Sequence, residues 1–205
     1  ALSNWDAGMD MYIYGKLGNL TMTKEGINVL MTNLTGKVPP ILQRLDYIRF
    51  NGEAAGYLHD LTLTGLFHTG AGMVKTDVMM SIDEQSMSRT YSGSVASADL
   101  DLGKLLNQEK KFGKVDFNVE LKGFNYKNRY PESYIKGIIS SFEYSQYQYE
   151  NIMLDGVYKD GGFNGRLSMD DANGSVQIDG NFNVAKTIPD FNLKASVKNL
   201  RPHDL

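Results

Sequence analysis

The chain has 205 residues and a formal net charge of −3, with 41% hydrophobic and 22% charged residues. This length allows one large domain or two small ones with a sizeable core, and the composition excludes a disordered chain. The absence of cysteine excludes disulfides, thiolate metal ligands and a cysteine nucleophile. Lysine and arginine are scattered along the sequence, so we expect no nucleic-acid partner.

No signal peptide is visible at the start of the given sequence. Residues 1–5 lack the basic and apolar regions of a signal peptide, and no run of about 18 apolar residues predicts a membrane-spanning helix. Both ends fall close to patterned segments. We therefore expect a fragment of a longer protein whose targeting signals lie in other parts.

The first half of the chain combines strand patterns with two short helical segments. Residues 39–46 begin with two prolines and continue with apolar residues at helical spacing, which predicts a short helix. Period-two alternation, typical of half-buried strands, follows over residues 61–67 and 74–82. Residues 101–107 suit one or two further helical turns.

The second half consists of alternating runs separated by turn residues. Residues 115–121 form one run, residues 147–184 predict consecutive hairpins, and residues 190–198 form a last strand. The breaks at residues 159–162 and 171–174 are rich in Asp, Asn and Gly, which tolerate the positive φ of tight hairpins. We therefore expect an antiparallel meander, a type of sheet that can stay solvated on one face.

The polar residues 107–114 are the predicted internal boundary. They separate an N-terminal β segment, residues 1–107, from a C-terminal antiparallel meander, residues 108–205. The expected fold class is all-β, mainly antiparallel, with one or two short helices, and we expect the two parts to form one continuous structural unit.

The apolar members of the alternating runs are the candidate functional residues. Two interpretations fit them: the core of an ordinary β-sandwich, which the periodicity alone favours, or a curved sheet whose apolar face lines a groove. The ten methionines suit an adaptable apolar surface. The candidate groove-lining residues are Leu61, Leu63, Phe67, Val74, Val78, Met80, Val115, Phe117, Val119, Leu121, Ile152, Leu154, Phe163, Leu167, Met169, Val176, Ile178, Phe182, Val184, Phe191, Leu193 and Val197.

No pattern in the sequence predicts catalysis, a cofactor or a metal site. There is no Gly-x-Ser-x-Gly elbow or P-loop, and no histidine has a partner at metal-ligand spacing. Residues 170–174 contain calcium-loop residue types but lack the later glutamate, which favours a hairpin turn. Tyr144, Tyr147 and Tyr149 suit either a sugar-binding platform or cross-strand aromatic pairing, and we favour pairing.

Two segments resemble a known family. Residues 98–106 (ADLDLGKLL) followed by residues 112–123 (FGKVDFNVELKG) resemble a recurrent pattern of AsmA-like and TamB-like envelope proteins. Residues 152–182 resemble the hairpin units of the TamB family. Together with weaker similarity in the first half, the resemblance covers most of the chain. Its motifs consist of strand and turn residues.

The resemblance implies a long, half-open, taco-shaped β-structure with an apolar interior. The family is anchored in the inner membrane, crosses the periplasm and works with an outer-membrane partner of the TamA or BamA type in outer-membrane assembly and phospholipid transport. It has no catalytic residues, and its membrane helix and partner-binding C-terminal region have no counterpart in this sequence. We therefore expect a non-enzymatic periplasmic segment with phospholipid or other acyl-chain cargo. The alternative is a β-sandwich binding module, either an adhesin or a carbohydrate-binding domain.

Overall fold

The structure is a computed structural model that describes residues 2–3, 12–35, 37–57, 59–83, 85–86, 88–125, 132–183, 189–199 and 201. Most of these residues belong to strands. In chain order the strands are β1 (Leu2–Ser3), β2 (Tyr12–Thr23), β3 (Tyr47–Tyr57), β4 (Asp60–Thr69), β5 (Gly72–Asp83), β6 (Ser88–Asp101), β7 (Phe112–Asn125), β8 (Glu132–Tyr144), β9 (Tyr147–Lys159), β10 (Gly162–Asp171), β11 (Gly174–Asn183) and β12 (Asp190–Lys198).

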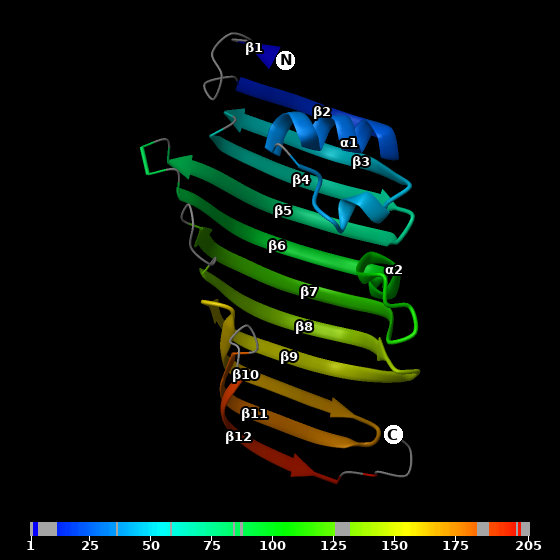
Figure 1. Cartoon of the computed structure of the whole chain (residues 1–205), viewed down its shortest axis with the longest axis vertical. Helices are drawn as coiled ribbons and strands as arrows, with labels where there is room; N and C mark the ends of the chain where they lie inside the picture. Colours follow the sequence, from blue (N-terminus) through cyan, green and yellow to red (C-terminus); the bar gives the residue numbers. More distant parts are fainter. Residues whose placement is uncertain are drawn as a thin grey trace.

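The described strands form a single antiparallel sheet in which each strand pairs with its neighbours in the sequence (Figure 1). The order runs from β1 to β12 without a crossover, and β12 does not return to pair with β1, so the sheet is open. The predicted fold class, mainly antiparallel all-β with short helices, is confirmed. The sheet also continues across residues 107–114, because β6 pairs with β7 along most of its length.

Tight turns connect the strands of the meander, and two of them have positive φ at both central residues, whereas in the turn at residues 171–174 only Gly174 has positive φ. Between β9 and β10, Asp160 and Gly161 have φ values of 51° and 77°, and between β8 and β9, Ser145 and Gln146 have 51° and 70°. Positive φ at both central residues matches the right-handed twist of the flanking strands. The hairpins expected over residues 147–184 are thus present as β9, β10 and β11.

Among the described residues, three helical segments lie between strands of the sequence: α1 (Lys24–Thr35), the 3-10 helix η2 (Leu42–Arg44) and α2 (Leu102–Leu106). The two expected helical segments correspond to η2 and α2, and η2 is shorter than expected. The helix α1 is absent from the sequence-based prediction. No helix among the described residues has the length and hydropathy of a membrane span.

The pairing register divides the side chains of the sheet between two faces. Residues that pair directly point to the same side, and successive residues of a strand alternate. The apolar face carries, among others, Phe50 and Phe67, which pair across β3 and β4, and Val119, which pairs with Val95 of β6. The polar face carries the residues between them in each strand, such as Glu120 and Lys122 of β7.

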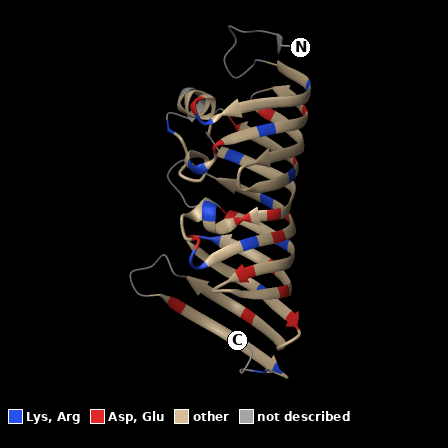
Figure 2. Ribbon diagram, turned by 90° about the vertical axis from the view of Figure 1, so that its right-hand side faces the viewer, with Lys and Arg blue, Asp and Glu red and all other residues tan. Residues whose placement is uncertain are grey.

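The helices cover one end of the apolar face and form the buried core there (Figure 2 shows them on one side of the sheet). Ile27 of α1 and Leu105 of α2 belong to a cluster with Ile48, Leu100 and Val115 of the sheet. Met22, Phe67, Phe117 and other half-buried side chains pack around it. The hydrophobic effect therefore holds the helices on the sheet.

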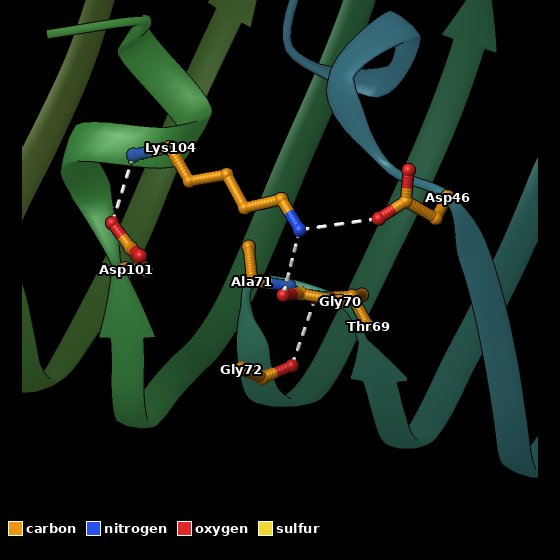
Figure 3. A network of polar contacts seen from close by, with 7 residues as sticks. All are labelled: Asp46, Thr69, Gly70, Ala71, Gly72, Asp101 and Lys104. Atoms are coloured by element: carbon orange, nitrogen blue, oxygen red, sulfur yellow. Dashed lines mark hydrogen bonds and ion pairs between the residues drawn. The ribbon is translucent and has the colours of Figure 1, made fainter. Parts of the chain in front are cut away.

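A network of polar contacts joins α2 to the β4–β5 hairpin and to the segment that precedes β3 (Figure 3). The Lys104 Nζ donates to Asp46 Oδ2 and to the carbonyl of Gly70, both at 3.1 Å. The Asp101 carboxylate caps α2 by accepting from the Lys104 backbone N–H at 2.8 Å. Because these contacts connect residues far apart in the sequence, they fix α2 over the end of the sheet.

Candidate functional site

The apolar face is the candidate site, because the structure places the residues singled out in the sequence on it. Val184 lies outside the described residues. All the other candidates share this face, as their direct pairs show: Leu61–Met80, Leu63–Val78, Phe67–Val74, Leu154–Leu167, Ile152–Met169, Phe163–Phe182, Leu167–Ile178, Met169–Val176, Phe182–Phe191 and Val176–Val197. Val115, Phe117, Val119 and Leu121 of β7 and Leu193 of β12 belong to the same face by register.

The described part of the chain leaves most of this face uncovered. The helices pack on the ends of β3 and β7 that carry Ile48 and Val115. The described strands pair with their neighbours in the sequence within one sheet. No second sheet packs on the first among the described residues. The arrangement therefore differs from a β-sandwich, whose two sheets bury their apolar faces against each other.

Exposure along the apolar face rises toward the C-terminal edge. Val115 and Ile152 are buried, Leu167 and Ile178 are half-buried, and the three apolar candidates of β12 are exposed. Phe182 is 38% exposed and Phe191, its partner in β12, is 59% exposed. The face thus passes from a small covered core to an open apolar surface.

Aromatic rings lie across glycines on this face. A Cβ atom added to Gly65 would approach the Phe50 ring to within 2.5 Å, and one added to Gly156 would approach the Phe163 ring to within 2.4 Å. The rings of Phe50 and Phe67 are 4.7 Å apart. Because the glycines lack side chains, ring carbons cover the backbone there and extend the apolar surface.

Tyr144 and Tyr149 have aromatic contacts across strands, with Phe112 and Phe142, and the ring of Tyr147 contacts that of Tyr149 within β9. Tyr144 pairs with Tyr147 across the β8–β9 hairpin, and the rings of Tyr147 and Tyr149 lie edge to face at 4.6 Å. Tyr149 also faces Phe142 at 6.3 Å. These are the contacts of aromatic pairing, the interpretation favoured from the sequence.

The Tyr147 hydroxyl is held by the β10–β11 turn. It donates to Asp171 Oδ2 at 3.1 Å and accepts from Asn173 Nδ2 at 2.6 Å. Desolvation, reinforced by the bond to Asp171, raises the pKa of Tyr147. The other Asp171 oxygen accepts from the Asn173 backbone N–H at 2.8 Å. Residues 170–174 are thus a hairpin turn, and no cluster of three or more His, Asp or Glu within the described chain could hold a metal ion.

The polar face carries a row of charges that alternate in sign across six successive strands. Each member lies directly opposite the next in the pairing register, which places one member on each strand from β7 to β12. The members are Glu120, Lys136, Asp155, Arg166, Asp179 and Lys194. We call this row the charge ladder. Its alternation satisfies the preference for opposite charges in cross-strand pairs.

Contacts at the charge ladder lower the pKa values of Asp155 and Asp179. Asp155 accepts from the Tyr134 hydroxyl at 2.9 Å and pairs with Lys136 at 3.3 Å. The hydrogen bond from Tyr134 is the larger cause of the lowered pKa of Asp155, and the contact with Lys136 adds to it. Asp179 accepts from Gln177 at 2.7 Å and from Arg166 at 2.6 Å, which lowers its pKa. Lys194 acts on Asp179 through its charge.

Two depressions of about 470 and 450 Å³ lie on the polar face. The larger is lined by side chains of the charge ladder and by Ile138 and Met153, and the smaller by Thr90, Lys122, Tyr134 and their neighbours. In the larger one Lys136, Asp155 and Arg166 already contact other members of the ladder. We therefore take the apolar face as the stronger candidate site.

Searches of protein-family models, curated proteins and solved structures found no match to this chain. The fold alone therefore defines the class of this protein. It is an open all-β sheet with one apolar face that is partly covered by short helices.

Proposed function

We propose that this chain is a non-catalytic periplasmic segment of a TamB-like or AsmA-like envelope protein, and that its apolar face carries the acyl chains of phospholipids between membranes in outer-membrane assembly. The observation that supports this proposal is the apolar face, which runs across the sheet to β12 and which, in the part of the chain that the structure describes, is covered by helices at one end. The resemblance of residues 98–123 and 152–182 to that family supports it independently.

The chemistry of the face suits acyl chains. Burial of a CH₂ group stabilises a complex by about 0.8 kcal/mol, so a chain lying across several strands gains substantial binding free energy. The side chains on the open part of the face, such as Leu154, Ile178 and Phe182, offer no directional polar group. Such a surface binds without selecting one position, and a bound chain can therefore slide along it.

Site-specific photocrosslinking tests the proposal. A photoreactive phenylalanine analogue at Phe182, on the apolar face, should capture a radiolabelled phospholipid from vesicles. The same analogue at Asn181, the neighbouring residue on the polar face, is the matched control and should capture much less. Equal capture at the two positions, or more at Asn181, would show that the apolar face is not the lipid surface.

A charge on the apolar face should block lipid binding. Phe182→Asp places a carboxylate where a desolvated acyl chain would lie, and because Phe182 is 38% exposed the fold should tolerate it. Lipid capture by an analogue at Phe191 should fall at least fivefold, while Asn181→Asp should leave it unchanged. Circular dichroism of both variants checks that the sheet remains folded.

A further inference from the structure

The polar face carries two pairs of apolar side chains on β8 and β9. Ile138 of β8 lies directly opposite Met153 of β9, and the two are 39% and 55% exposed. Tyr134, which is also exposed, lies opposite the half-buried Val157. Isolated apolar side chains are common on protein surfaces, but pairs grouped on a mainly polar face indicate a contact with another surface.

An ion pair lies between the two apolar pairs. Lys136 and Asp155 are opposite each other in the pairing register, and Lys136 Nζ is 3.3 Å from Asp155 Oδ2. The group therefore has charges at its centre and apolar side chains on both sides of them along the strands. We call it the β8–β9 patch, and its members are Tyr134, Lys136, Ile138, Met153, Asp155 and Val157.

The larger of the two depressions on the polar face lies at the β8–β9 patch. It has a volume of about 470 Å³, and its lining includes Ile138, Met153, Lys136 and Asp155. Because Lys136 and Asp155 pair with each other within the chain, the depression does not require an ion to balance its charge. It has room for an apolar side chain of a partner, and methionine adapts well to such a space because its side chain is unbranched and flexible.

We propose that two copies of this chain pack through their polar faces as a symmetric dimer, with the two-fold axis parallel to the strands and between β8 and β9. In a two-fold interface both copies use the same surface, so each contact occurs twice. The axis places β8 of one copy over β9 of the other, and the strands of the two sheets are then nearly aligned, as in other face-to-face packings. The dimer leaves the apolar face free and does not depend on lipid binding.

The β8–β9 patch is complementary to itself in this arrangement. Residues that pair in the register within one copy meet again between the copies, because the axis exchanges β8 with β9. Ile138 of each copy thus lies over Met153 of the other, and Lys136 lies over Asp155. Apolar side chains meet apolar ones, and the central charges of the two copies alternate in sign.

The charge ladder extends this complementarity to the neighbouring strands. The axis also exchanges β7 with β10, so Glu120 of one copy lies over Arg166 of the other. In the row on one side of the ladder, Asn118 lies over Ser168, and both are polar. Across β7 to β10, no like charges meet directly between the copies in the ladder or in the rows on either side of it.

Two other arrangements match the β8–β9 patch less well. A two-fold axis perpendicular to the strands would place Lys136 over Lys136 and Asp155 over Asp155, and like charges opposed in an interface are unfavourable. An anionic membrane surface would attract the cations of the charge ladder but repel its acids. Charge complementarity therefore favours a second copy in the stated orientation.

Sedimentation velocity of the full chain over a range of concentrations tests whether it dimerises. We expect a dimer, and Met153→Asp should raise its dissociation constant roughly tenfold or more, because the new carboxylate lies against apolar side chains of the partner. Met79→Asp is the matched control. Met79 is 51% exposed on the same face but lies on β5, so its substitution should have little effect.

An exchange of charges tests the orientation of the two copies. Lys136→Glu alone and Asp155→Lys alone should each weaken the dimer, because like charges then meet between the copies. A mixture of the two variants should form a tighter heterodimer, since every contact between these positions then joins opposite charges. The repulsion within each chain is the same in the mixture as in the separate variants, so a tighter complex reports on the interface. Both side chains are exposed, and the fold should tolerate the changes.

The proposal is overturned if the protein stays monomeric, if Met153→Asp weakens the dimer no more than Met79→Asp, or if the mixed variants associate no more tightly than each variant alone. It is also overturned if Phe182→Asp abolishes the dimer while Met153→Asp leaves it intact, since the copies would then meet through the apolar face. Circular dichroism checks that each variant retains the sheet.

Discussion

At the scale of single residues, two strand-interior glycines determine how closely neighbouring strands approach. Gly93 in β6 and Gly180 in β11 both have φ of 140°, where side chains are strained. A Cβ atom would lie 2.0 Å from the Asp77 carbonyl oxygen at Gly93 and 2.1 Å from the Asn192 carbonyl oxygen at Gly180. Both glycines lie on the apolar face, so the close strand contacts are part of that face.

We predict that Gly93→Ala lowers the free energy of unfolding by about 2 kcal/mol or more, because the backbone must leave its conformation and the strands must separate. Urea denaturation followed by circular dichroism measures the change. Gly18→Ala is the matched control: Gly18 also lies in a strand, but no atom lies within 4 Å of its added Cβ. A similar loss in both variants would contradict the importance of the close approach.

At the scale of elements, Leu105 is the buried hydrophobic side chain that α2 contributes to the core. Leu105 is 6% exposed within the core cluster, whereas the adjacent Leu106 is 37% exposed. Leu105→Ala should therefore lower the free energy of unfolding by about 2 to 4 kcal/mol, the usual cost of truncating a buried leucine. Leu106→Ala should cost less than about 1 kcal/mol. Equal effects in thermal or urea unfolding would show that α2 does not rest on Leu105.

The charge ladder gives a prediction about pH. The pKa of Asp155 is lowered first by the Tyr134 hydroxyl, so Tyr134→Phe should raise it toward the ordinary value for aspartate in an NMR titration. Tyr158→Phe, on the opposite face, should leave it unchanged. Because the folded pKa lies below the unfolded one, the ionised carboxylate stabilises the fold above the unfolded pKa, and this contribution is lost as pH falls through the folded pKa. Tyr134→Phe should therefore weaken this acid dependence.

The alternating runs predicted β4, β5, β7 and β9 to β12. They did not predict β2, β6 and β8, and neither α1 nor the register was predicted. Strand alternation is local, so it revealed which residues share a face, as with Val176 and Ile178. Among the α1 side chains that the structure describes, only Ile27 is buried, and Val29 and Leu30 are exposed, so no clear helical stripe forms there. The charge ladder depends on register, which the turns and the irregularity between Ser97 and Leu100 set. The turns and the irregularity depend on backbone conformation, which residue types alone do not specify.

At the scale of the whole molecule, stability should fall from the helix-covered strands toward the C-terminal edge. β7 has two neighbouring strands and packs against α2, whereas β12 has one neighbour and no buried residue. Amide hydrogen exchange in native conditions should therefore be slowest in β7 and fastest in β12. Uniform protection across the described strands would indicate instead that the sheet opens only as one cooperative unit.

The sequential strand order also bears on how the chain acquires its structure. Each described strand pairs with the described strands just before and after it in the sequence, so the strand contacts have short sequence separation. Low contact order favours fast folding, and nearest-neighbour packing allows growth from any formed hairpin. The chain can thus fold hairpin by hairpin in the order in which it emerges from a ribosome or a translocation channel, and no early strand must wait for a late one.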